Sequence, residues 1–193
     1  MRESMTHSIT SAAEFLVENL ALLKDLHYEH GVLDLACGSG RNGLLLADLN
    51  IPVVFADNNR AAIELLQGYL VQRELPGECW LVDLEAGSQD PLQSRCFDAV
   101  LAFNYLHRPL LKSLKRAIRG GGIIMYETFT VKQPEFGRPT NPDFLLQEQE
   151  LLNCFSDWKI LHYYEGIVAN PTRASARLIA RKRAARQNYR PRR

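Results

Sequence analysis

The chain has 193 residues, of which 46% are hydrophobic and 23% charged, and its formal net charge is +1. The length fits one domain with a substantial core, and the composition is that of a globular protein in water. It argues against a membrane protein, because the longest apolar runs, such as residues 97–103, are far shorter than a membrane span. Residues 1–10 lack the basic-then-apolar order of a secretory signal, so we expect a cytoplasmic protein.

The four cysteines of the chain are widely spaced, and no pair of histidines lies near them. This pattern predicts neither a zinc site nor a disulfide framework. We therefore expect no metal ligands.

Basic residues are concentrated at the end of the chain. Residues 181–193 are rich in lysine and arginine and contain no acidic residue, so the rest of the chain is mildly acidic. Such a tail can contact nucleic acid, but short basic termini are more often solvated and disordered. We expect one domain over residues 1–182, beginning with a helix, and a disordered tail over residues 183–193.

Hydrophobic periodicity predicts helices and strands in alternation. The chain opens with a predicted helix over residues 9–27. The predicted strands cover residues 31–36, 52–57, 78–84, 97–103, 122–129, 158–168 and 173–182. The helices predicted among these strands cover residues 41–49, 60–74, 109–118 and 144–155. Mostly apolar strands that alternate with helices indicate a parallel sheet covered on both faces.

The last two predicted strands are joined only by residues 169–172. This connection is too short for the crossover that parallel neighbours require, so the final strand should be antiparallel. The predicted fold class is α/β. We expect a Rossmann-like three-layer sandwich with a seven-stranded, mostly parallel sheet whose last strand is antiparallel.

Residues 33–43, LDLACGSGRNG, contain the spacing G-x-G-x-x-G. This spacing is typical of loops that bind the pyrophosphate of a dinucleotide. Asp34, however, lies four positions before the first glycine, and its carboxylate would repel a pyrophosphate. Gly43, the last glycine, is better explained as a helix residue that packs on the sheet.

Four features together resemble the class I S-adenosylmethionine-dependent methyltransferases over about residues 10–182. These are a strand that ends in D-x-A-C-G-x-G, Asp57 and Asp83 at the ends of the next two strands, and a terminal β-hairpin. Within this class, CGSGRN (37–42) is similar to the tellurite-resistance-type group. ETF (127–129) with FGRPTNPDFLL (136–146) is similar to small bacterial methyltransferase-like proteins.

The resemblance implies S-adenosylmethionine as the cofactor, and residue chemistry agrees. This cofactor has no phosphate, so Asp34 can serve its ammonium group directly or by fixing the turn around it. Asp57 can accept the ribose hydroxyls, Asp83 can reach the adenine, and Phe103 lies near the sulfonium. The expected cofactor-binding residues are Asp34, Ala36, Gly38, Gly40, Asn42, Asp57, Asn58, Asp83, Leu84, Phe103 and Asn104.

Each strand-end aspartate also has a simpler explanation. Asp57 can cap the helix that follows it, and Asp83 can cap a helix or stabilise a turn. The combination of these residues at the expected spacing favours the cofactor.

The acceptor should face residues 104–109 and the segment after the fifth strand. We predict His107 as a general base and Arg108 and Arg138 as clamps for an anionic group. The alternatives are that His107 caps the next helix and that Arg138 only ties down its own loop. Pocket walls are expected from Tyr105, Tyr126 and Phe136, and Glu127 is expected to hold a polar substrate or orient an arginine.

The long polar loop of residues 130–143 is predicted to close over the cleft as a lid. The alternative is a loop that is packed permanently on the surface.

The sequence thus predicts in-line methyl transfer to a small-molecule acceptor. A nucleophilic anion or thiolate would need no base. The alternatives are an RNA or protein methyltransferase that uses the basic tail, and a non-enzymatic protein that binds the cofactor. Nucleic acid is not favoured, because residues 104–107 read NYLH instead of the N/D-P-P-Y/F signature of amino-group methylation.

Overall fold

The computed structural model describes residues 11–87 and 90–184. A single sheet runs through it in the order β3-β2-β1-β4-β5-β7-β6. All neighbouring strands are parallel except β7, which is antiparallel to both β5 and β6. The predicted fold class is therefore confirmed. The strands are β1 (Val32–Leu35), β2 (Val53–Asp57), β3 (Gly77–Leu81), β4 (Phe97–Phe103), β5 (Ile118–Phe129), β6 (Lys159–Val168) and β7 (Arg173–Arg181).

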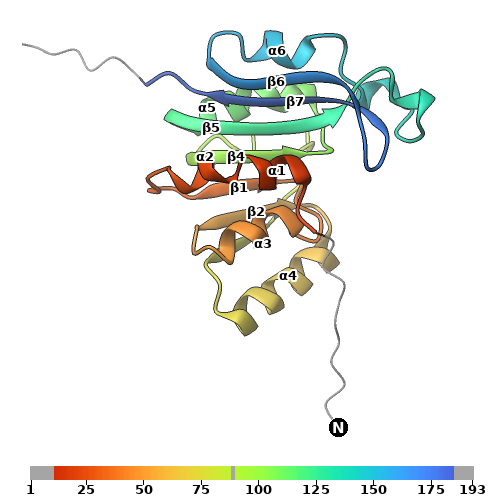
Figure 1. The fold of residues 1–193 in the computed structure, drawn as a ribbon. Coiled ribbons are helices and arrows are strands. Elements are labelled where there is room, and N and C mark those ends of the chain that lie inside the picture. Colours follow the sequence, from red (N-terminus) through yellow and green to blue (C-terminus); the bar gives the residue numbers. More distant parts are fainter. Residues whose placement is uncertain (1–10, 88–89, 185–193) are drawn as a thin grey trace, which may run out of the picture.

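Helices cover both faces of this sheet (Figure 1). One apolar core joins the sheet to α1–α4, and a second joins it to α5 and α6. The helices are α1 (Glu14–Glu18), α2 (Leu20–Lys24), α3 (Arg41–Ala47), α4 (Arg60–Arg73), α5 (Leu111–Ala117) and α6 (Glu150–Cys154). The 3-10 turns are η1 (Arg108–Leu110), η2 (Gln133–Glu135) and η3 (Pro142–Phe144). None of the helices in the described ranges is long and apolar enough to span a membrane.

Two helices differ from the prediction. The opening helix is divided at Asn19, whose side-chain amide donates to the Phe15 carbonyl at 2.9 Å and so competes with the helical hydrogen bonds. The helix predicted over residues 144–155 begins only at Glu150. Before it, the chain forms the turn η3, and Leu146 pairs with Thr130 in an isolated parallel bridge.

Two strand boundaries also differ. β3 ends at Leu81, so Asp83 lies in the following turn and not at the strand end. β5 begins at Ile118 and continues through the glycine run that was expected to precede it. Gly122 permits this path, because a Cβ atom there would lie 2.6 Å from the Asp98 carbonyl oxygen.

Asp98, near the start of β4, holds the segment that leads into β1. Its fully buried carboxylate accepts backbone hydrogen bonds from Glu29, His30 and Gly31 at 2.7–2.9 Å and forms an ion pair with Arg119. Burial alone would raise the pKa of Asp98, but these hydrogen bonds and the guanidinium hold it below its ordinary value.

The basic tail predicted over residues 183–193 falls mostly outside the described residues, which end at residue 184.

Candidate functional site

Asp34 holds the start of α3 against the sheet. Its Oδ2 atom accepts a hydrogen bond from the Gly43 amide at 2.8 Å, and the carboxylate is buried. Burial raises the pKa of Asp34 to about 7, although the Gly43 hydrogen bond and the Arg41 charge lower it. A Cβ atom at Gly43 would lie 2.4 Å from the Phe55 ring. The Gly43 contact fits one of the two roles predicted for Asp34, which is to fix the turn, and its role towards the cofactor stays a prediction.

Asp57 links the end of β2 to the glycine loop. Its Oδ2 atom accepts from the Gly38 amide at 2.7 Å, and its Oδ1 atom accepts from the Asn59 amide at 2.8 Å. The cap of α4 is Asn59, whose side chain accepts from the Ala62 amide. Asp57 is therefore not the helix cap that the alternative explanation required.

A cavity of about 180 Å³ opens beside Asp57 and is lined by Ala36, Asn58, Val82, Asp83, Leu84, Glu85 and Tyr105. The Asp83 side chain is exposed, and its Oδ1 atom accepts from the Glu85 amide at 2.9 Å. This contact stabilises a turn, as the alternative for Asp83 expected. The carboxylate nevertheless borders the same cavity as Asp57.

A second cavity, of about 330 Å³, lies along the glycine loop. Its walls include Asp34, Ala36, Gly38, Asn42, Phe103 and Asn104. All the predicted cofactor-binding residues border one of these two cavities except Gly40. Gly40 lies just before α3 as its N-cap residue, with a φ of 76° that favours glycine. A Cβ atom there would lie 2.8 Å from the Leu66 side chain, so close packing also requires glycine.

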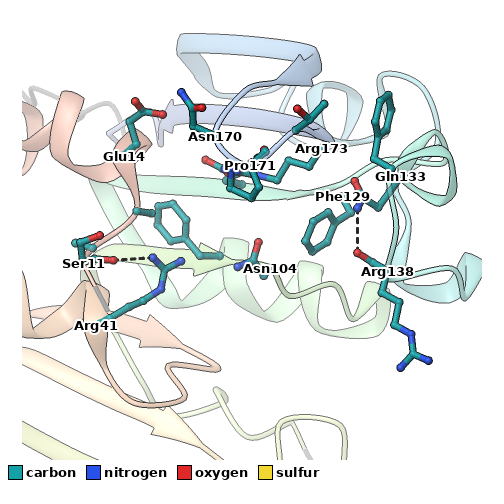
Figure 2. A pocket seen from close by; sticks show the side chains of 16 residues that line it. Ser11, Glu14, Arg41, Asn104, Phe129, Gln133, Arg138, Asn170, Pro171 and Arg173 are labelled. Atoms are coloured by element: carbon teal, nitrogen blue, oxygen red, sulfur yellow. Dashed lines mark hydrogen bonds and ion pairs between the residues drawn. The ribbon is translucent and has the colours of Figure 1, made fainter. Parts of the chain in front are cut away.

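A larger cavity, of about 710 Å³, adjoins the second one and shares Arg41, Phe103 and Asn104 with it (Figure 2). The amino-terminal segment forms one wall. The Arg41 guanidinium donates to the Ser11 carbonyl at 2.9 Å, and the Asn42 side chain accepts from the Ala13 amide at 2.9 Å. Other walls come from Glu127, Phe129, Gln133, Phe136, Arg138, Asn170, Pro171, Thr172 and Arg173.

A cluster of three charged residues borders and underlies this cavity. The buried carboxylate of Glu127 on β5 forms ion pairs with Arg173 and Arg177, both on β7. The Arg177 guanidinium also lies over the Phe15 ring, 5.3 Å from its centre. The prediction that Glu127 orients an arginine is therefore confirmed.

The three residues predicted to act in catalysis do not come together. Arg108 binds both carboxylate oxygens of Glu150 and donates to the carbonyls of Asp143 and Leu145. His107 makes no side-chain cap, and its Nδ1 atom lies 3.9 Å from a Glu85 carboxylate oxygen. Neither residue lines the 710 Å³ cavity.

Arg138 does line that cavity, but its guanidinium extends away from the other labelled side chains (Figure 2). Its backbone carbonyl accepts from the Gln133 side chain at 2.9 Å. The catalytic roles of His107, Arg108 and Arg138 stay predictions, and the contacts of Arg108 favour a structural role.

The residues expected to wall the acceptor pocket have different fates. Tyr126 is fully buried and donates to the Tyr105 carbonyl at 2.8 Å, so it does not wall the cavity. Tyr105 borders the 180 Å³ cavity instead, whereas Phe136 lines the 710 Å³ cavity. Gln133 anchors the base of the proposed lid, because its side chain accepts from the Ala174 amide at 2.9 Å.

Sequence reasoning missed Arg173 and Arg177 as members of the site. A signal was present, since the first half of β7 carries polar residues at positions 173, 175 and 177, in alternation with alanines. In a covered sheet, this alternation indicates that one face of the strand end has a polar neighbour.

Comparisons with known proteins agree with this architecture. The family model described as tellurite resistance protein TehB matches residues 23–175. The probable S-adenosyl-L-methionine-dependent methyltransferase TehB of Haemophilus influenzae is 28% identical over 140 residues, which are 70% of this chain and 48% of that protein. Hemagglutinin 1 of Eikenella corrodens is 26% identical over 157 residues, which are 78% of this chain and 51% of that protein. The chain spans about half the length of these curated relatives.

The crystal structure of TehB from Haemophilus influenzae superposes with a TM-score of 0.71 at 25% identity, covering 90% of this chain and 63% of that chain. Coclaurine N-methyltransferase, solved with N-methylheliamine and SAH, shares the fold alone, with a TM-score of 0.63 at 13% identity, covering 87% of this chain and 72% of that chain. The resemblance predicted from the glycine loop is thus confirmed. Because the family model matches most of its length, the chain belongs to the TehB family of tellurite resistance proteins.

Proposed function

We propose that the protein is an S-adenosylmethionine-dependent methyltransferase that methylates a small acceptor in the 710 Å³ cavity. The observation that carries this proposal is the shared wall of two cavities, formed by Arg41, Phe103 and Asn104. A cofactor whose sulfonium lies against this wall would direct its methyl group from the glycine-loop cavity into the larger one.

The residues around the glycine loop fit this cofactor. A Cβ atom at Gly38 would meet nothing within 4 Å, so the methionine portion can approach the backbone there. Each Asp57 oxygen accepts one backbone hydrogen bond and, with its second lone pair, keeps capacity for a ribose hydroxyl. The Asp34 carboxylate, which borders the same cavity as Gly38, supplies negative charge for the ammonium group.

The cofactor, when bound, supplies an electrophilic methyl group on sulfur. The chain contributes alignment and exclusion of water, which are the main requirements of an in-line displacement. Asn104 is held in place just after β4, because its backbone amide donates to the Glu127 carbonyl at 2.8 Å. No side chain has to accept a proton if the acceptor is already a nucleophilic anion.

Charge in the larger cavity supports an acceptor of this kind. Three arginines (Arg41, Arg138 and Arg173) line it against two carboxylates (Glu14 and Glu127), and Glu127 is paired with two guanidiniums. The names of this family refer to tellurite resistance. Tellurite is therefore the first acceptor to test, followed by thiols and small carboxylates.

Two measurements test the proposal. Calorimetry should show binding of S-adenosylhomocysteine in the micromolar range, about −8 kcal/mol, and none of NAD. Incubation with radiolabelled S-adenosylmethionine and the acceptor panel should then release S-adenosylhomocysteine. Binding without turnover on any acceptor would favour a non-enzymatic cofactor-binding protein, and binding of NAD alone would refute the proposal.

A further inference from the structure

The charged cluster below the acceptor cavity contains one more arginine than a simple ion pair needs. Glu127 lies directly opposite Arg177 in the β5–β7 pairing, and Arg173 is four residues from Arg177 on the same face of β7. Their side chains are only 3%, 12% and 18% exposed for Glu127, Arg177 and Arg173. Two cations and one anion are therefore held together away from solvent.

The three residues lie at different depths. Glu127 and Arg173 line the cavity. Arg177 does not, and its guanidinium packs against the face of the Phe15 ring of α1. One Glu127 oxygen contacts Arg173, and the other lies 3.0 Å from the Arg177 Nε atom. Among the described residues, Glu127 Oε2, Arg177 Nε and Arg177 Nη2 are all buried without a hydrogen-bond partner, so the Glu127–Arg177 contact is an ion pair without hydrogen-bond geometry. Glu127 is the only carboxylate within ion-pair distance of this guanidinium there.

This arrangement decides how much charge the cavity wall presents. Without Arg177, the Glu127 carboxylate would cancel the charge of Arg173 and leave a neutral pair at the wall. With Arg177 on its second oxygen, the same carboxylate is shared, and the cluster keeps a net charge of about +1. Burying a second guanidinium has a high desolvation cost unless the group is paired with a carboxylate.

We propose that Arg177 and Glu127 are positioning residues: Glu127 orients Arg173 at the acceptor cavity, and Arg177 preserves the positive charge of Arg173 by sharing that carboxylate. This role rests on the proposed function, because it assumes that the larger cavity receives the acceptor. It differs from the role of an acceptor contact, since Arg177 itself does not reach the cavity.

A charge-restoring pair of variants tests this role. The ligand probes are tellurite, acetate and inorganic phosphate. Each is titrated at constant ionic strength into the complex of the protein with S-adenosylhomocysteine. Binding is measured as a shift of the melting temperature. Arg177→Met should raise the apparent Kd of the anion that the wild type binds most tightly by fivefold or more. The double variant Glu127→Gln/Arg177→Met restores the net charge and keeps an acceptor oxygen for Arg173, so its Kd should return to within about twofold of the wild type.

The controls separate charge from packing. Arg173→Gln should abolish anion binding, whereas Arg181→Gln, at the other end of β7, should leave it unchanged. If Arg177 only packs against Phe15, the double variant will bind anions as weakly as Arg177→Met, and the proposal is wrong. It is also wrong if the wild type binds none of the three anions. Binding of S-adenosylhomocysteine and methyl turnover test the proposed function separately, since neither measurement depends on the charge cycle.

Discussion

The glycine loop and the acceptor cavity share a wall but are assembled from different parts of the chain. At the loop, Asp34 contacts Gly43 and Asp57 contacts Gly38 across sequence separations of 9 and 19 residues. At the acceptor cavity, the Glu127–Arg173 and Gln133–Ala174 contacts span 46 and 41 residues. The cofactor side is thus a local motif, whereas the acceptor side exists only after the sheet has formed.

The two sides also differ in how many segments of the chain build them. Backbone hydrogen bonds to Asp34 and Asp57 depend on a few short-range positions and fix one loop shape. The acceptor cavity collects walls from the amino terminus, β5, the loop over residues 130–143 and the β6–β7 hairpin. Its chemistry can change through any of these segments without a change in the cofactor loop. If the two sides are separable, variants on each should affect different measurements.

The largest effect is expected at Gly43. Its replacement by alanine places a Cβ atom 2.4 Å from Phe55 and 2.9 Å from the Asp34 carboxylate, in a packed interior. Urea denaturation should show a loss of about 3 kcal/mol in the free energy of unfolding, together with weaker binding of S-adenosylhomocysteine. Gly68→Ala is the control, because a Cβ atom there meets nothing within 4 Å in the interior of α4, and it should stabilise the protein by roughly 0.5–1 kcal/mol. Equal unfolding free energies for the two variants would contradict the tight packing of α3 on the sheet.

The second effect concerns pH and Asp34. Its pKa is about 7 in the folded protein and about 3.9 in an unfolded chain. The folded state therefore favours the protonated acid, and this contribution to stability is lost as the pH rises from about 4 through 7. Asp34→Asn should remove that loss, so its stability relative to the wild type should increase over this range, by roughly 3–4 kcal/mol.

The same carboxylate links pH to ligand binding on the cofactor side. If the ammonium group of S-adenosylhomocysteine lies near Asp34, affinity should increase towards pH 7 in the wild type and stay constant in Asp34→Asn. Calorimetry at several pH values measures this directly. Parallel pH profiles for the two proteins would place the ammonium group away from Asp34.

A smaller effect is expected for Asp57→Asn. The amide replaces one carboxylate oxygen, which weakens the contacts to Gly38, Asn59 and the ribose hydroxyls. The Kd for S-adenosylhomocysteine should rise about tenfold, or roughly 1.4 kcal/mol, with little change in stability. Asp48→Asn is the matched control, because Asp48 is exposed and, within residues 11–87 and 90–184, pairs only with Arg73 at 3.4 Å. An unchanged Kd in Asp57→Asn would remove the ribose from this position.

The smallest effect is expected for Arg138→Ala, on the acceptor side. Its guanidinium extends away from the cavity (Figure 2), but the loop over residues 130–143 remains a candidate lid. If the loop closes during turnover, the rate should fall a few-fold while the Kd for S-adenosylhomocysteine stays the same. Unchanged turnover would favour a loop that is packed permanently on the surface.

The contrast between the two sides also describes what sequence reasoning could reach. The seven-stranded, mostly parallel sheet and the antiparallel β7 followed from apolar periodicity and one short connection, whereas the strand order came only from the structure. The roles of Asp34 and Gly43 followed from their spacing in one motif. The acceptor side could not be predicted in this way, because the pairing of Glu127 with Arg177 depends on the register between β5 and β7.

Two expectations met long-range contacts that the local sequence does not encode: the helix from residue 144 was wrong, and the catalytic role of Arg108 stays a prediction. The helix expected from residue 144 was displaced by a long-range pairing between Leu146 and Thr130, which no local propensity encodes. Arg108 follows a strand end, as a site residue would, yet Glu150 and two backbone carbonyls use its donors. In both cases a tertiary partner, absent from the local sequence, decided the outcome.

The two ends of β4 differ in what surrounds them. At its beginning Asp98 gathers three backbone amides and Arg119, and just after its end Asn104 borders both ligand cavities. Only six positions along the chain thus separate Asp98, whose carboxylate is fully engaged in the interior, from Asn104, which borders the cavities. A substitution at Asn104 can therefore change the walls of both cavities without touching the contacts that Asp98 makes at the other end of the strand.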